Sequence, residues 1–177
     1  VMHKFNTKHD LTFIGVGAYD KLRLNLKENK KDEQKILLRL LPIQNQWNYT
    51  IGVRYRYFME NSYLIIVASR SMFGNQIFKF KDNLATNPKL FDLNSTEAEN
   101  KLRLEHVIRK NGFKITYGGN YEYARYTTTT VISWNIDSNV INVNYASRLS
   151  IHKYGLFTQI SRSFCKLGHQ VIFLILF

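Results

Sequence analysis

The sequence predicts an all-β fold, an antiparallel up-and-down meander of about six or seven strands. Residues 47–57 alternate strictly between aromatic or aliphatic side chains and polar or cationic ones, and successive strand residues point to opposite faces of a sheet. Aromatic residues make up 14% of the chain and only 2 residues are Pro, a composition that favours strands. Along the chain, long and short connections between the alternating segments follow one another in turn. This is the layout of a meander that has short turns at one end of its sheet and long loops at the other.

The N-terminal part is expected to contain one strand and one short helix. The strand is predicted over residues 10–26, where leucines alternate with polar residues near its end. Residues 27–35 are a run of charges that must be solvated. A short helix is predicted over residues 36–41, because Pro42 cannot continue it.

The second and third strands are expected to form a hairpin. The second covers residues 46–58 and the third residues 63–73, with a tight connection over residues 59–62. The third strand alternates less clearly, because it is apolar at both odd and even positions. Residues 74–100 are polar, and we expect an irregular connection there.

The fourth and fifth strands are predicted to form a second hairpin. The fourth begins near Lys101, and the fifth covers residues 113–126. Asn111 and Gly112 lie between them, and Asn-Gly between two alternating segments is a strong hairpin signal.

The C-terminal part is less regular. Residues 127–150 are expected to be a long polar connection with local strands, and the sixth strand is predicted over residues 151–164. Residues 165–177 end in an apolar run that does not alternate, as a truncated or frameshifted product would. We therefore expect one partial domain over residues 1–177, with an atypical end.

The chain is strongly basic. Lys and Arg number 25 against 13 Asp and Glu, a formal net charge of +12. Such a charge suggests an anionic partner such as nucleic acid or acidic lipid, although lysine-rich loops that only aid solubility would give the same balance. The single cysteine, Cys165, cannot form an internal disulfide and does not indicate a compartment.

The layout suggests the wall of an outer-membrane β-barrel, with short turns at one end and long loops at the other. A barrel strand shows an apolar face to lipid and a polar face to the lumen. The residues expected to face lipid are Trp47, Tyr49, Ile51, Val53, Tyr55, Tyr57, Leu102, Leu104, Ile115, Tyr117, Tyr121 and Tyr123. The residues expected to face the lumen are Arg54, Arg56, Arg103, Glu105, Lys114, Asn120 and Glu122, and we expect Arg70 to join them.

The alternative is a basic soluble β-domain that binds nucleic acid. Such a sheet stacks bases on aromatic rings and surrounds those rings with Lys and Arg on the same face. Here Tyr55 and Tyr57 lie opposite Arg54 and Arg56. This segregation favours lipid on one face and water on the other.

No catalytic or metal-binding pattern is apparent, and we expect neither an enzyme nor a cofactor. The 5 histidines show no metal-ligand spacing. His106 is expected to be a packed histidine on the apolar face. Glu105 and Glu122 are expected to form cross-strand ion pairs with neighbours such as Arg103 and Lys114.

Four segments carry a family resemblance. They are QWNYTIGVRYRYF, NKLRLEHVIRKNGFK, YGGNYEYARYT and HKYGLFTQISRSF, together with LTFIGVGAYDKLRLNL near the start. Their order resembles the barrel of TonB-dependent outer-membrane receptors of the Bacteroidetes type, over roughly residues 8–164.

The resemblance implies a partial barrel from a nutrient transporter. In that family a barrel of about 22 strands encloses an N-terminal plug, and an inner-membrane complex acts through TonB. The implied partners are therefore outer-membrane lipid, the remainder of the barrel and the plug, with TonB reached only through that plug. No plug, TonB box or signal peptide is recognisable in these residues. The expected location is the outer membrane, and we do not expect transport by this segment alone; the substrate cannot be read from it.

Overall fold

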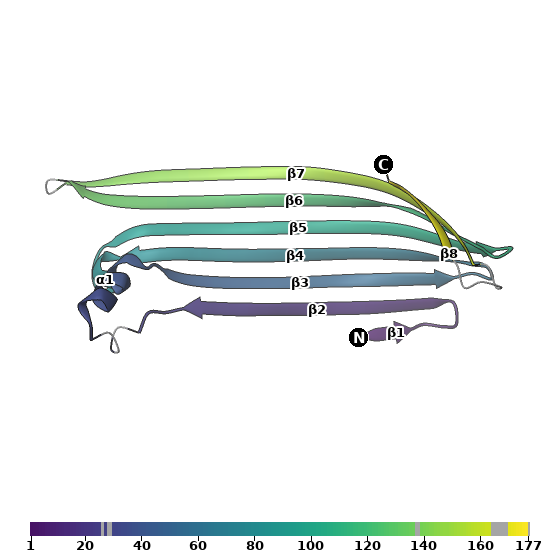
Figure 1. The fold of residues 1–177 in the computed structure, drawn as a ribbon, viewed down its shortest axis with the longest axis horizontal. Helices are drawn as coiled ribbons and strands as arrows, with labels where there is room; N and C mark the ends of the chain where they lie inside the picture. The colour runs from purple at the N-terminus through teal and green to yellow at the C-terminus, as the bar shows by residue number, and fades with distance from the viewer. Residues whose placement is uncertain (26, 28–29, 137–138, 164–169, 177) are drawn as a thin grey trace.

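The strands of this protein form one open sheet. The computed structural model describes residues 1–25, 27, 30–136, 139–163 and 170–176. Within them, eight antiparallel strands lie side by side in the order of the chain, so the all-β fold class and the up-and-down meander are confirmed (Figure 1). The elements are β1 (Met2–Lys4), β2 (His9–Leu22), α1 (Asp32–Leu40), β3 (Ile43–Phe58), β4 (Ser62–Phe80), η1 (Lys81–Asn83), β5 (Lys89–Lys110), β6 (Phe113–Ile136), β7 (Asn139–Ser163) and β8 (Gln170–Leu176).

The six long strands, β2 to β7, correspond to the predicted ones, but most extend further. The expectation of irregular connections over residues 74–100 and 127–150 is wrong. Residues 89–100 belong to β5, and residues 127–136 continue β6. These extensions carry Thr, Ser and Asn on both faces, so they pair as strands without an apolar alternation that the sequence could reveal.

The two short connections adopt the expected geometry. Asn111 and Gly112 have φ angles of 53° and 79°, which is the two-residue turn that matches the twist of a hairpin. The β3–β4 turn is closed by a hydrogen bond of 2.8 Å from the backbone N–H of Met59 to the carbonyl of Ser62. Both turns lie at the same end of the sheet (Figure 1).

The helix is confirmed but begins earlier than predicted, at Asp32, and ends at Leu40, two residues before Pro42. The Gln34 side chain accepts a hydrogen bond from the backbone N–H of Lys31, at 3.2 Å, which satisfies one donor at the helix start. Asn83 donates through Nδ2 to the carbonyls of Leu38 and Leu41, and so connects η1 to the end of α1.

Both ends of the chain differ from the sequence expectation. The first strand stops at Leu22, and its predicted end, Leu26, lies outside the described residues. A short strand, β1, pairs with β2 near the N-terminus. Residues 164–169, which include Cys165, also lie outside the described residues. The apolar run after them is a strand, because β8 pairs with residues 157–163 of β7.

The sheet is a single layer with very little core. Among the described residues, the only buried hydrophobic side chains are Ala98 and Val107. Large apolar side chains such as Phe13, Leu104 and Tyr154 are about half exposed or more. A water-soluble sheet normally covers one apolar face with a second layer, so this sheet needs a covering that its own described residues do not supply.

Candidate functional site

The two faces of the sheet differ in chemistry. Antiparallel pairing fixes which residues share a face, since directly paired side chains point the same way. We call the face that carries Trp47 and Tyr55 the aromatic face, and the face that carries Arg54 and Arg56 the charged face. The register places all twelve residues predicted to face lipid on the aromatic face, and all seven predicted to face a lumen on the charged face.

Arg70 departs from the prediction. It pairs directly with Ile51 of β3 and with Asn100 of β5, which places it on the aromatic face. The expectation that it would line a lumen with the other arginines is therefore wrong. The sequence was ambiguous here, because β4 is apolar at both odd and even positions and gives no preferred face.

The large side chains of the aromatic face form a band across the sheet. One row of directly paired residues crosses six strands through the middle of the band: Phe13, Val53, Ala68, Leu102, Tyr121 and Tyr154. Below it, toward the short turns, lie Leu11, Tyr55, Ile66, Leu104 and Leu156. Above it, toward α1, the same face of β5 to β7 carries mostly Asn, Ser, Thr and Arg, while β4 carries Arg70, Met72, Gly74 and Gln76 before Phe78.

The upper edge of the band runs obliquely across the strands. In β2 and β3 the edge residues are Tyr19 and Trp47, which pair directly. In β7 the edge residue is Tyr154, which stands in the row of Val53, six residues along β3 from Trp47. Six residues of strand span about 20 Å and five strand spacings about 24 Å, so the edge makes an angle of about 40° with the rows.

Tyrosine–histidine pairs border the band. Tyr55 Oη lies 2.6 Å from His9 Nδ1, and Tyr117 Oη lies 2.7 Å from His106 Nδ1, both near the short turns. At the upper edge, Tyr121 Oη lies 2.9 Å from His152. The prediction that His106 packs on the apolar face agrees with this geometry. These pairs could not be found from the sequence, because their members are brought together only by register.

The charged face carries ion pairs at the same level as the band. Arg56 donates to both oxygens of Asp10 at 2.7–3.0 Å, and the Asp10 side chain is only 5% exposed. Arg54 donates to the Thr12 hydroxyl at 3.1 Å. The Arg54 Nε atom is buried without a partner among the described residues.

A second group of charges crosses three strands. Glu122 lies between Lys101 at 3.5 Å and Lys153 at 2.7 Å, and Lys101 also pairs with Glu99. The predicted cross-strand pairing of Glu122 is therefore present, with different partners. Glu105 instead pairs with Arg103 of its own strand at 2.7 Å. The charged face is mixed rather than uniformly polar, because Ile14 and Val16 of β2 are exposed on it.

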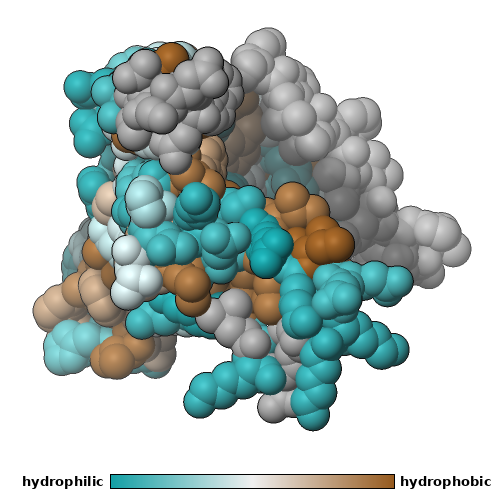
Figure 2. Space-filling model, turned by 90° about the vertical axis from the view of Figure 1, so that its left-hand side faces the viewer, coloured by the Kyte–Doolittle hydropathy of each residue, from teal (hydrophilic) through white to brown (hydrophobic). Residues whose placement is uncertain are grey.

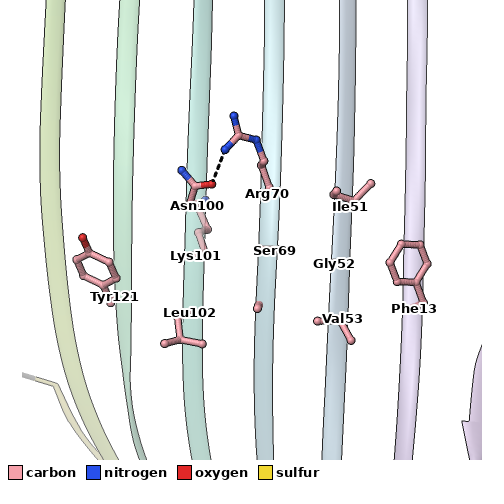
Figure 3. A pocket seen from close by; sticks show the side chains of 11 residues that line it. Phe13, Ile51, Gly52, Val53, Ser69, Arg70, Asn100, Lys101, Leu102 and Tyr121 are labelled. Carbon is pink, nitrogen blue, oxygen red and sulfur yellow. Dashed lines mark hydrogen bonds between the residues drawn. The ribbon is translucent and has the colours of Figure 1, made fainter.

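A hollow of about 480 Å³ lies in the aromatic face (Figure 3). Its floor includes the small residues Gly52, Ala68 and Ser69. Large side chains from four strands surround it, namely Phe13, Ile51, Val53, Leu102 and Tyr121. Figure 3 shows Arg70 and Asn100 side by side at one end of the hollow, joined by a hydrogen bond of 3.0 Å from Arg70 Nη1 to Asn100 Oδ1.

Neither a metal cluster nor a membrane-spanning helix is found in the part of the chain that the structure describes. No group of three or more His, Cys, Asp or Glu side chains there could hold a metal ion. None of the described helical segments is long and apolar enough to cross a membrane. No protein-family model, curated protein or solved structure matches this chain.

Proposed function

We propose that this chain is a segment of the wall of an outer-membrane β-barrel, with its aromatic face toward lipid and its charged face toward an aqueous lumen. The observation that carries the proposal is the oblique band. Strands of membrane barrels are tilted by roughly 35–45° from the barrel axis, so a band level with the membrane must make about that angle with the rows, which run perpendicular to the strands. The measured obliquity of about 40° fits a membrane plane, whereas a packing partner with no membrane would not require it.

The polar groups agree with this orientation. In hydrocarbon an unpaired backbone group costs several kcal/mol, and a continuous ladder of long antiparallel strands pairs these groups. The ion pair of Asp10 and Arg56 and the group around Glu122 lie on the face that would meet water. Aromatic residues at both borders of the band correspond to the girdles at the two membrane interfaces.

The length of the strands favours a large barrel. A membrane strand needs only about 9–11 residues, whereas β5, β6 and β7 have 22, 24 and 25. The end of the molecule that carries α1 shows many hydrophilic side chains beside smaller hydrophobic patches (Figure 2). We assign this end to the outside of the cell. With the segments named above, these features support a TonB-dependent nutrient receptor, in which the missing strands and a plug complete the transporter.

Nucleic-acid binding receives less support. The rings of Tyr55 and Tyr121 lie on the face opposite Arg56, Arg103 and Lys101. Arg70, Arg125 and Arg148 stand on the face of the rings but above Tyr121, so a base stacked on Tyr55 would meet few cations.

Fluorescence quenching by brominated lipid tests the orientation. Trp134→Phe leaves Trp47 as the single tryptophan, at the upper edge of the band. In vesicles, lipids brominated near the head group should quench Trp47 strongly, and lipids brominated near the chain end should quench it less. The matched control moves the indole one residue, to the charged face, in the triple variant Trp47→Phe, Asn48→Trp and Trp134→Phe. Quenching that is equal for the two positions, or absent at Trp47, would contradict the proposal.

A further inference from the structure

Arg70 is the cation of the aromatic face that lies beside the hollow, while Lys21, Arg125, Arg148 and Arg162 stand elsewhere on the same face. It is exposed, and it lies between Ala68 and Met72 of β4, in the row of Ile51 and Tyr123. Its described partners are neutral: Asn100 Oδ1 at 3.0 Å and Met72 Sδ at 3.2 Å. No carboxylate among the described residues pairs with it. A charged side chain on a lipid-facing surface is costly unless a partner of opposite charge accompanies it.

The hollow lies directly beside this cation. Ala68 precedes Arg70 on the same face and forms part of the hollow floor, while Phe13, Val53 and Leu102 form apolar walls. Figure 3 shows the Arg70 guanidinium pointing away from Val53 and Leu102, toward the end where Asn100 lies. An occupant of this site therefore needs an apolar chain for the hollow and an anionic group at one end.

The level of Arg70 fixes which end of a lipid it meets. Arg70 pairs with Ile51, and Tyr49 and Trp47 lie two and four residues further toward the upper edge on the same strand, so Arg70 lies just inside the aromatic border and its long side chain can reach the head groups there. A guanidinium carries five N–H donors and matches a phosphate with two parallel hydrogen bonds. Two donors are used by Asn100 and Met72, which leaves others for a phosphate.

We propose that the hollow binds one acyl chain of an anionic phospholipid whose phosphate is held by Arg70. The inference rests on the proposed membrane orientation and adds a specific lipid site to it. The charge of Arg70 supplies the complementarity, and the small side chain of Ala68 leaves space for the chain between Val53 and Leu102.

The test measures lipid selectivity of the 177-residue chain in mixed micelles. Nitroxide-labelled phosphatidylglycerol and phosphatidylcholine are compared by electron paramagnetic resonance, which separates protein-bound from free lipid. Arg70→Gln should lower the selectivity for phosphatidylglycerol about fivefold, the scale expected for one cation at a membrane surface. Arg109→Gln is the matched control, because it removes an exposed arginine from the opposite face.

A second variant separates the hollow from the charge. Ala68→Leu fills the floor and keeps Arg70, so it should weaken binding of both labelled lipids and leave their ratio closer to that of the unchanged chain. Unchanged selectivity in Arg70→Gln, or an equal loss in Arg109→Gln, would overturn the lipid site while leaving the membrane orientation intact. If brominated lipids did not quench Trp47, the indole would lie in water, and both the lipid site and the membrane orientation would be overturned.

Discussion

Asp10 illustrates how single residues on the charged face contribute to stability. Its carboxylate accepts from two nitrogens of Arg56 and is almost fully buried. Removing one partner of such a pair leaves the other charge with unsatisfied donors in a place that water reaches poorly.

We therefore predict that Asp10→Asn lowers the free energy of unfolding by about 2 kcal/mol. Urea unfolding in detergent micelles, followed by tryptophan fluorescence, measures it. Asp20→Asn is the control, since Asp20 lies on the same strand and face but is exposed. Equal losses in the two variants would mean that the ion pair adds no stability.

The face on which most residues lie was predictable from the sequence, but the face of Arg70 was not. In residues 47–57 of β3 and over most of residues 113–123 of β6, apolar and polar residues alternate, so the sequence alone indicated the faces of these segments correctly. In β4 a run of apolar residues removes that contrast, and only pairing with β3 and β5 decides the face. The hollow beside Arg70 depends on Val53, Ala68 and Leu102 from three strands, a juxtaposition that local patterns do not contain.

At the scale of elements, the β5–β6 hairpin depends on two residues with positive φ. Gly112 has a φ of 79°, a conformation that costs a residue with a Cβ atom about 1 kcal/mol.

Gly112→Ala should therefore destabilise the chain by about 1 kcal/mol in the same unfolding assay. Gly15→Ala is a suitable control because an added Cβ at Gly15 would meet Ile51 at an ordinary distance of 3.7 Å. If Gly15→Ala were the more damaging change, the turn would not be the stabilising feature that its geometry indicates.

The elements were predicted unevenly, for a physical reason. Short turns carry their own signal, because Asn-Gly favours a conformation that other residues avoid. The outer halves of β5 and β6 carry no such signal, because Thr, Ser and Asn occur on both faces and the apolar Phe91 and Leu93 lie on the charged face of β5. Their strand structure follows from pairing with neighbours, as in Thr96 and Thr127, whose hydroxyls lie 2.6 Å apart.

For the whole molecule, the open edges determine behaviour in water. Beyond residue 13 the outer edge of β2 has no described partner, and the outer edge of β7 has none before residue 157. Unpaired edges and an exposed apolar face both promote association.

We expect the isolated chain to form large assemblies in buffer and to become smaller, discrete species in detergent. Analytical ultracentrifugation with and without detergent measures this change. A stable monomer in buffer alone would contradict the barrel proposal, because such a monomer would need a water-compatible aromatic face.

The length of β6 has a further consequence for the exterior of the cell. The band ends near Tyr123, yet β6 continues to Ile136. Thirteen more residues reach about 40 Å along the strand, which in the proposed barrel would be roughly 30 Å above the membrane after correction for tilt. Such a collar of paired strands, rich in Thr and Asn, would be the first part of the protein that an antibody, a phage or a protease meets. Since its backbone N–H and C=O groups are already hydrogen-bonded to neighbouring strands, it should resist proteolytic cleavage far better than a loop of the same composition.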